Sequence, residues 1–215
     1  AVDTLYRVAW DYEYASAAYF QLAEISSISG DPARAMQEAR MAVNYNGMNL
    51  DAKNLLTTLL RYNGQREEAI LLASEVLSVD PLNYYATHEL MKLGQKSEAS
   101  FARLLRDESE SYLELGLYYL NNGFYGEAAD ILSGNDRIAS YPTVAYYRAF
   151  LADKKGDTAT AKVLFESAES ASVDYVYPFR LETVAVYEKA LEYLPASAHT
   201  WYYLGNLYFQ KQPAR

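Results

Sequence analysis

The sequence predicts an all-α protein built from antiparallel helix hairpins that stack side by side. The first observation is an internal repeat: Gly30 and Gly64 lie 34 residues apart, and Gly123 and Gly156 lie 33 apart. Secondly, each glycine separates two stretches with helical apolar periodicity, as expected of the turn inside a hairpin. Thirdly, half of the residues are apolar, while Pro and Gly are sparse. Together these features predict a helical array of about 13 helices.

Half a hairpin followed by five repeats accounts for residues 1–171. Residues 1–15 carry the apolar spacing of a second helix alone. The clearest repeat has an apolar stripe on its first helix, Gly64 at its turn, and Pro81 where its second helix must stop. In chain order, the repeats are predicted at 16–49, 50–83, 84–108, 109–141 and 142–171.

The remaining residues, 172–215, depart from the repeat. The stretch SVDYVYP at 172–178 is predicted to be an irregular connection. The helix predicted over 179–194 again has the pattern of a second helix, so it lacks a first helix to pair with. A first helix then begins near Trp201 without its second half. With half a hairpin at each end, we expect the sequence to be a piece of a longer protein.

Several stretches resemble the tetratricopeptide repeat (TPR) family, whose pattern is W-x2-L-G-x2-Y followed by A-x3-F. The resemblance covers nearly the whole chain. It implies a right-handed α-solenoid, in which the first helix of each repeat lines a concave groove. The residues that match best are Tyr112, Leu115, Gly116 and Tyr119 with Ala128 and Leu132, and then Trp201, Leu204, Gly205 and Tyr208.

By this resemblance, a partner would bind against fixed positions on the first helices. These positions carry aromatic and mixed polar side chains, which suit recognition because large flat groups lose little entropy on binding. The chain has 22 tyrosines, and the pattern leaves open whether the excess forms binding surface or hairpin core. The candidate groove residues are Phe20, Asn54, Arg61, Tyr62, Tyr85, His88, Tyr146, Phe150 and Tyr202.

Charge and composition argue against several classes of partner. The net charge is −9 and no long Lys/Arg run occurs, so nucleic acid and anionic membrane surfaces are poor partners. No apolar run approaches the length of a membrane-spanning helix, so membrane insertion is not expected. Cysteine is absent, which excludes disulfides and thiolate chemistry.

Catalytic motifs are also lacking. The stretch from His88 to Lys92 begins like H-E-x-x-H but has Lys where a zinc site needs the second His. No phosphate-binding glycine loop and no G-x-S-x-G turn are found. We therefore expect no catalytic residue, no metal and no cofactor. An enzyme or sugar-binding groove that uses the aromatic residues for stacking is the least favoured alternative.

Two functions fit these observations: a non-catalytic scaffold that binds a protein or peptide, and a structural module that packs against other domains of its own polypeptide. Self-association through open ends of the array is a further possibility. A second resemblance bears on the structural module. Tyr177–Glu182, YPFRLE, resembles the TPR regions of large bacterial proteins with a mutarotase-like N-terminal domain, whose function is unknown or carbohydrate-related. The first residues do not resemble a signal peptide, and the compartment is left open.

Overall fold

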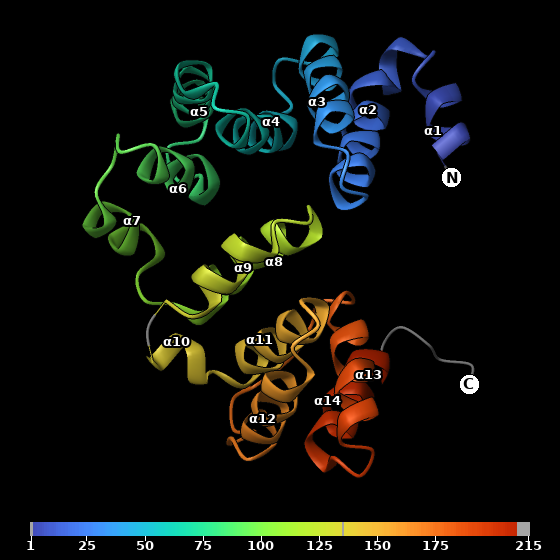
Figure 1. Ribbon diagram of the computed structural model, residues 1–215, viewed down its shortest axis with the longest axis vertical. Helices are drawn as coiled ribbons and strands as arrows, with labels where there is room; N and C mark the ends of the chain where they lie inside the picture. The colour runs from blue at the N-terminus through green and yellow to red at the C-terminus, as the bar shows by residue number, and fades with distance from the viewer. Residues whose placement is uncertain (1, 135, 210–215) are drawn as a thin grey trace. The chain divides into compact units, whose positions relative to one another are not determined.

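All regular structure in the described part of the chain is helical. The computed structural model describes residues 2–134 and 136–209, which form 14 α-helices and no β-strand (Figure 1). The sequence predicted about 13 helices from the repeat period. The short helix α10 (Asp136–Ser140) forms at the end of the fourth predicted repeat, where Ile138 is buried. No described helix combines the length and apolar character needed to cross a membrane.

The chain divides into two compact units, and the division falls inside a helix. The first unit comprises Ala1–Asp107 and Leu117–Phe124, and the second comprises Glu108–Gly116 and Tyr125–Arg215. Helix α8 (Ser109–Asn121) therefore contributes its beginning to the second unit and its end to the first.

Helix hairpins make up most of the first unit (Figure 1). Small side chains bring the helices close together, because Ala23, Ala35, Ala39 and Ala69 are fully buried between them. Leucines fill the remaining space, in agreement with the predicted apolar stripe. The helices of this unit are α1 (Val2–Val8), α2 (Tyr12–Ile28), α3 (Pro32–Tyr45), α4 (Leu50–Tyr62), α5 (Arg66–Val79), α6 (Tyr84–Lys92) and α7 (Glu98–Leu105).

The turn between α4 and α5 contains the glycine that the repeat pattern predicts for it. Gly64 has φ of 75°, a left-handed conformation in which a side chain would be strained. The amide of Gln65 donates to the carbonyl of Leu60 at 2.9 Å, which closes the end of α4. Helices α4 and α6, the first helices of two predicted hairpins, begin with side-chain caps, since Asn49 and Asn83 each accept a hydrogen bond from an amide of the first turn.

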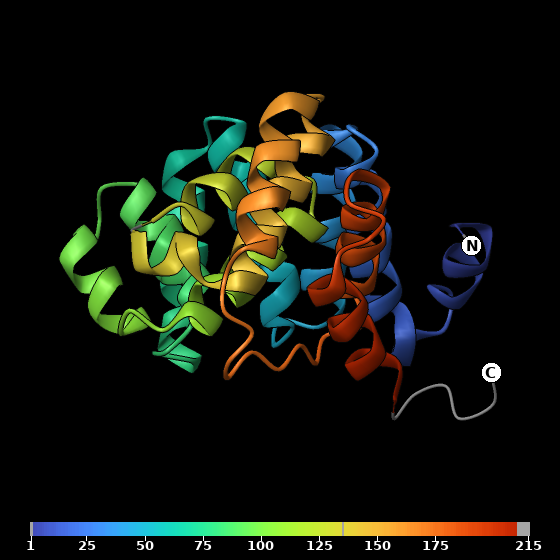
Figure 2. The ribbon, with the colours of Figure 1, turned by 90° about the horizontal axis from the view of Figure 1, so that it is seen from below.

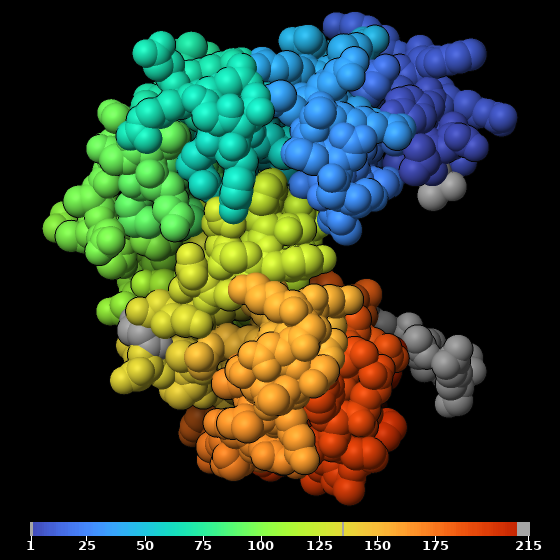
Figure 3. Space-filling model, viewed as in Figure 1, coloured from blue at the N-terminus to red at the C-terminus, as the bar shows by residue number. Residues whose placement is uncertain are grey.

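The second unit packs its helices around tyrosines. Tyr146, Tyr147, Tyr187 and Tyr203 are almost completely buried, together with Phe165. Hairpin α11/α12 lies beside α13 and α14, and Figure 3 shows these helices as one block. This unit contains the start of α8 and the whole of α10. Its other helices are α9 (Tyr125–Leu132), α11 (Pro142–Lys154), α12 (Thr158–Glu169), α13 (Thr183–Tyr193) and α14 (Ala198–Phe209).

An irregular connection runs from the end of α12 to α13, as predicted for 172–178 (Figure 2). It is longer than predicted, because helix α13 begins at Thr183 instead of residue 179. Pro178 disfavours helix in the residue before it. Arg180 then forms an ion pair with Glu110 at 2.5 Å and lies over the Phe179 ring, 4.3 Å from its centroid. These contacts hold residues 179 and 180 in a non-helical conformation.

Candidate functional site

In the first unit, helices α4 and α6 present the inner face that the repeat pattern assigns to a groove. We call the residues Asn54, Thr58, Arg61, Tyr85, His88 and Glu89 the α4–α6 wall. The end of α8 and the turn after it, Leu117–Phe124, lie against this wall, and we call them the resident segment.

Aromatic rings form one part of this contact. The Tyr118 and Tyr85 rings pack together, and the Phe124 ring stacks on Tyr62 with centroids 5.3 Å apart. Beyond the rings, the Ser27 hydroxyl of α2 donates to the carbonyl of Asn122 at 2.6 Å. The resident segment is therefore held at both of its ends.

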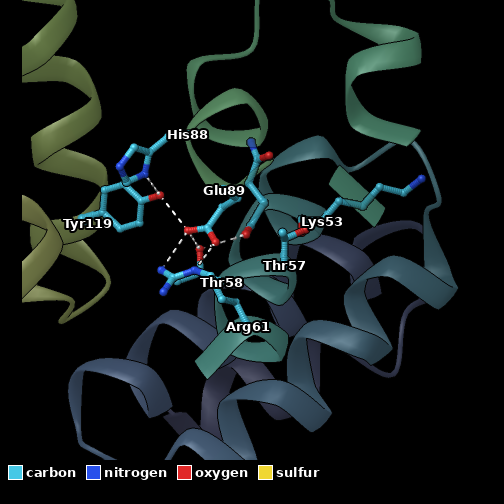
Figure 4. A network of polar contacts seen from close by, with 8 residues as sticks. Lys53, Thr57, Thr58, Arg61, His88, Glu89 and Tyr119 are labelled. Atoms are coloured by element: carbon cyan, nitrogen blue, oxygen red, sulfur yellow. Dashed lines mark hydrogen bonds and ion pairs between the residues drawn. The ribbon is translucent and has the colours of Figure 1, made fainter. Parts of the chain in front are cut away.

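The centre of the contact is a carboxylate with no exposed surface, Glu89. Arg61 binds it through Nε at 2.5 Å and Nη2 at 3.2 Å. The hydroxyls of Thr58 and Tyr119 donate to Glu89 Oε1 at 2.9 and 2.7 Å (Figure 4). A buried carboxylate is tolerated only when it is paired and hydrogen-bonded, and these three side chains supply that compensation.

His88 extends the network to a second group on the wall. Its Nδ1 lies 2.7 Å from the Tyr119 hydroxyl oxygen. Because the Tyr119 proton is donated to Glu89, Nδ1 must carry a proton and donate to Tyr119, which assigns the tautomer from the hydrogen-bond network. Tyr119 thus joins the wall through two hydrogen bonds.

The electrostatics of the contact keep its tyrosines neutral. Burial raises the pKa of Tyr119 well above its ordinary value, and the neighbouring Glu89 carboxylate raises this pKa further. Burial also raises the pKa of Tyr85 and of Tyr118. These phenols are therefore neutral, and Tyr119 acts as a hydrogen-bond donor and not as a base. Since Glu89 has no exposed surface, its hydrogen bonds and ion pair join side chains within the fold.

A similar arrangement holds a second carboxylate in the first unit. Glu38 on α3 is 4% exposed and accepts hydrogen bonds from Ser26 at 2.5 Å and from Arg34 at 3.1 Å. Tyr6 of α1 also donates to it. At both Glu38 and Glu89, one arginine, one tyrosine and one aliphatic hydroxyl surround the carboxylate.

The three candidate groove residues of the second unit differ in exposure. Tyr146 is fully buried, and its hydroxyl lies 3.0 Å from that of Thr200 and 3.2 Å from Glu169. Phe150 is also buried, with the Lys154 ammonium 5.1 Å from its ring centroid. Tyr202 is half exposed.

Exposure divides the nine predicted groove residues. Tyr62 and Tyr202 are exposed, while Phe20 and Arg61 are partly buried. Asn54, Tyr85, His88, Tyr146 and Phe150 are buried among the chain's own residues. That any of the nine predicted groove residues binds a partner stays a prediction.

Sequence reasoning did not assign a role to Glu89 or to Tyr119 in binding. Glu89 lies between His88 and Leu90 in a helix that buries no other acidic residue. An isolated acidic residue in such a helix implies a buried cation partner, and Arg61, one repeat earlier, is the nearest candidate in the pattern. This signal could have linked the two residues.

Large exposed aromatic residues occur in both units. Trp10 and Tyr12 are 89% and 75% exposed in the first unit. In the connection before α13, Tyr175, Tyr177 and Phe179 are 88%, 70% and 61% exposed. Within residues 2–134 and 136–209, no group of three or more His, Cys, Asp or Glu residues could hold a metal ion.

Comparison with known proteins finds TPR proteins among solved structures and nothing more specific. The matches include TTC0263 from Thermus thermophilus at 16% identity and TM-score 0.43, covering 89% of this chain and 98% of that one. YrrB, described as a TPR protein with an unusual peptide-binding site, matches at 16% identity and TM-score 0.43, covering 81% and 95%. PilF from Pseudomonas aeruginosa also matches at 16% identity and TM-score 0.43, covering 94% and 95%.

At this identity and with TM-scores below 0.5, these similarities say nothing about what the chain binds. No family model matches the chain, and no curated protein matches it either. The resemblance of Tyr177–Glu182 to proteins with a mutarotase-like domain stays a prediction.

Proposed function

We propose that this chain is a non-catalytic scaffold that binds a protein or peptide through exposed aromatic side chains. The observation that carries the proposal is the row formed by Tyr175, Tyr177 and Phe179 in the connection before α13. Exposed clusters of large aromatic residues mark binding surfaces, because they bury much apolar area at little entropic cost.

The three rings fall on alternate residues of an irregular connection, in which Tyr175 lies in a turn with φ of 61°. Val176 is 3% exposed and the side chain of Arg180 is 19% exposed, so these two residues face the second unit. Tyr175, Tyr177, Phe179 and Leu181, which alternate with them, are exposed. These large apolar side chains are therefore accessible to a partner.

The chemistry of this surface selects a partner that is apolar and basic. Ring faces attract cations, and the chain carries a net charge of −9. Among the predicted groove residues, Tyr62 and Tyr202 are exposed in the same way. We include Tyr202, which belongs to the same unit as the row, in the proposed contact surface and treat Tyr62, in the first unit, as a separate contact.

A displayed library of random peptides tests this function without a known partner. Peptides enriched on the chain are expected to combine aromatic or aliphatic residues with Lys or Arg. Their affinity should fall at least about tenfold when Tyr175, Tyr177 and Phe179 are all replaced by Ser. The matched control replaces Leu71 and Val163, both 62% exposed and outside the row, by Ser. Equal losses in both variants, or no enriched peptide, would contradict the proposal.

A structural module is the second candidate function, and the resident segment favours it. Five of the nine predicted groove residues are buried by the chain's own residues. A module that serves packing needs no outside partner for these positions. Failure to enrich any peptide, together with cooperative unfolding of the isolated chain, would favour this function over the scaffold.

A further inference from the structure

The contact between the α4–α6 wall and the resident segment has the composition of a recognition interface. Its hydrogen-bonding members are tyrosine, histidine, arginine, glutamate and threonine, and its other rings are tyrosine and Phe124, which also packs against the leucine core. The neighbouring core of the same unit is different, since Leu55, Leu56, Leu59 and Leu60 pack there against alanines. Permanent contacts are usually apolar, whereas contacts that form and separate are more polar and rich in Tyr and Arg.

Two buried polar atoms in this contact make no hydrogen bond to the described part of the chain. They are the hydroxyl of Tyr85 and Oδ1 of Asn122. Buried polar groups are nearly always hydrogen-bonded, so two in one contact need a reason. Separation of the resident segment would expose both to water, which lowers the cost of opening.

The resident segment presents a short and specific set of groups. Tyr118 supplies a ring for Tyr85, Tyr119 supplies a hydroxyl for Glu89, and Phe124 supplies a ring for Tyr62. Asn122 and Gly123 form the turn, where Gly123 has φ of 81° and packs against the backbone of α2. A helix that ends in this set of groups is therefore the ligand that the wall fits.

We propose that the α4–α6 wall is a binding site for a helix of another protein, and that the resident segment closes it as an intramolecular ligand. The partner helix carries two adjacent tyrosines near its C-terminal end and an aromatic residue after its last turn. It replaces Tyr118, Tyr119 and Phe124 on the wall. This proposal uses none of Tyr175, Tyr177 and Phe179, so either proposal can fail without the other.

Closure reduces the apparent affinity for such a partner. Only the fraction of molecules with the resident segment displaced can bind, and the dissociation constant rises by the inverse of that fraction. A change that weakens the resident segment and leaves the wall intact must therefore increase affinity. A merely structural segment would give no binding in any variant.

The probe is a fluorescein-labelled peptide with the natural sequence of residues 113–126, and the protein is the full chain. The opened variant combines Tyr119→Phe with Phe124→Ser in the protein. Fluorescence anisotropy should show at least about tenfold tighter binding to the opened variant than to the unchanged chain. The matched control is Tyr147→Phe, which removes another buried hydroxyl, bonded to Thr183 at 2.9 Å, and should leave affinity unchanged.

A substitution on the α4–α6 wall tests whether the peptide binds at Glu89. Adding Glu89→Gln to the opened variant should remove most of the gain, because the peptide's tyrosine then loses its charged acceptor. Binding by the opened variant that is no tighter than by the unchanged chain would falsify the proposal. So would a gain that Glu89→Gln leaves intact. A dimer of the opened variant in light scattering would overturn the choice of partner, since a second copy would then occupy the wall.

If the opened variant does not fold, hydrogen exchange on the unchanged chain tests whether the resident segment separates from the α4–α6 wall. Amides of Leu117–Asn122 should exchange through an opening that leaves the amides of Leu55–Leu60 in α4 protected. Exchange of both segments only with global unfolding would overturn the proposal.

Discussion

The two units hold a glutamate against a buried tyrosine in different ways. In the first unit, Glu89 has no exposed surface and is bound by Arg61. In the second unit, Glu169 is partly buried and accepts from the hydroxyls of Tyr146 and Ser197. Glu169 ends α12, but its carboxylate lies near the start of α14, where Oε1 is 3.5 Å from the amide nitrogen of His199.

Burial explains the difference. A carboxylate that keeps contact with water needs only hydroxyls and the positive end of a helix. A carboxylate with no exposed surface loses all of its hydration and needs a full positive charge beside it. The same residue type therefore anchors a helix end in one unit and fixes a charged contact in the other.

Removing the cation should have the largest effect. Arg61→Ala leaves the Glu89 carboxylate buried without a counter-charge, which is expected to lower the free energy of unfolding by about 3–5 kcal/mol. Urea unfolding measures the change. The comparison in the second unit is Thr200→Val, which removes a neutral hydroxyl and should cost about 1 kcal/mol. Equal losses at the two sites would contradict the distinction between them.

Removing a tyrosine hydroxyl should have a smaller effect that again differs between the units. In Tyr119→Phe, a hydrogen bond to a carboxylate is lost, with an expected cost of about 1.5–3 kcal/mol. In Tyr147→Phe, the lost hydrogen bond joins two hydroxyls, Tyr147 to Thr183, and about 1 kcal/mol is expected. Thermal unfolding of both variants in one buffer gives the ranking, and the reverse ranking would refute it.

Helix packing offers a third comparison at equivalent repeat positions. The first unit has Ala23, fully buried, where the second has Gly116. A Cβ on Gly116 would lie 2.7 Å from Cγ of Leu132. Gly116→Ala should therefore destabilise the chain by about 1–3 kcal/mol through overpacking.

Gly205→Ala is the control for that change. It lies inside α14, where no atom stands within 4 Å of the added Cβ, so it should stabilise by about 0.5–1 kcal/mol. Both values come from denaturant unfolding. Stabilisation by Gly116→Ala would show that α8 and α9 are less closely packed than described.

These positions also show what could be predicted from the sequence. The helices, the glycine turns and the irregular connection follow from periodicity and from the conformational limits of Gly and Pro, which are local. The burial of Tyr85 and His88 cannot be predicted in this way, because it depends on where Leu117–Phe124 packs in the folded chain. Repeat spacing assigns those residues to an inner face but does not say what covers it.

A pH-dependent effect is expected of Glu24, an acidic residue that interacts electrostatically with Tyr118 of the resident segment. Burial, with a smaller contribution from Asp51, raises the pKa of Glu24 to about 7. A folded-state pKa above the unfolded value means that the stability present at low pH is lost as pH rises through about 7.

Glu24→Gln should remove this loss of stability at high pH. At pH near 8 we expect the variant to be more stable than the unchanged chain by about 1–2 kcal/mol, after allowing for partial solvent exposure. At pH near 4 the two should be equal, because the carboxyl is protonated in both states. Denaturant unfolding at both pH values measures this, with Glu188→Gln, an exposed site, as control. A difference that does not change with pH would refute the assignment.

A double-mutant cycle between Tyr119 and Glu89 tests most directly whether the resident segment is bound to the α4–α6 wall. The free energies of unfolding of Tyr119→Phe, Glu89→Gln and the double variant give the coupling between the two side chains. Contact at 2.7 Å predicts a coupling of about 1–2 kcal/mol. Additive effects, within about 0.3 kcal/mol, would show that Tyr119 does not bind Glu89 and would contradict the account.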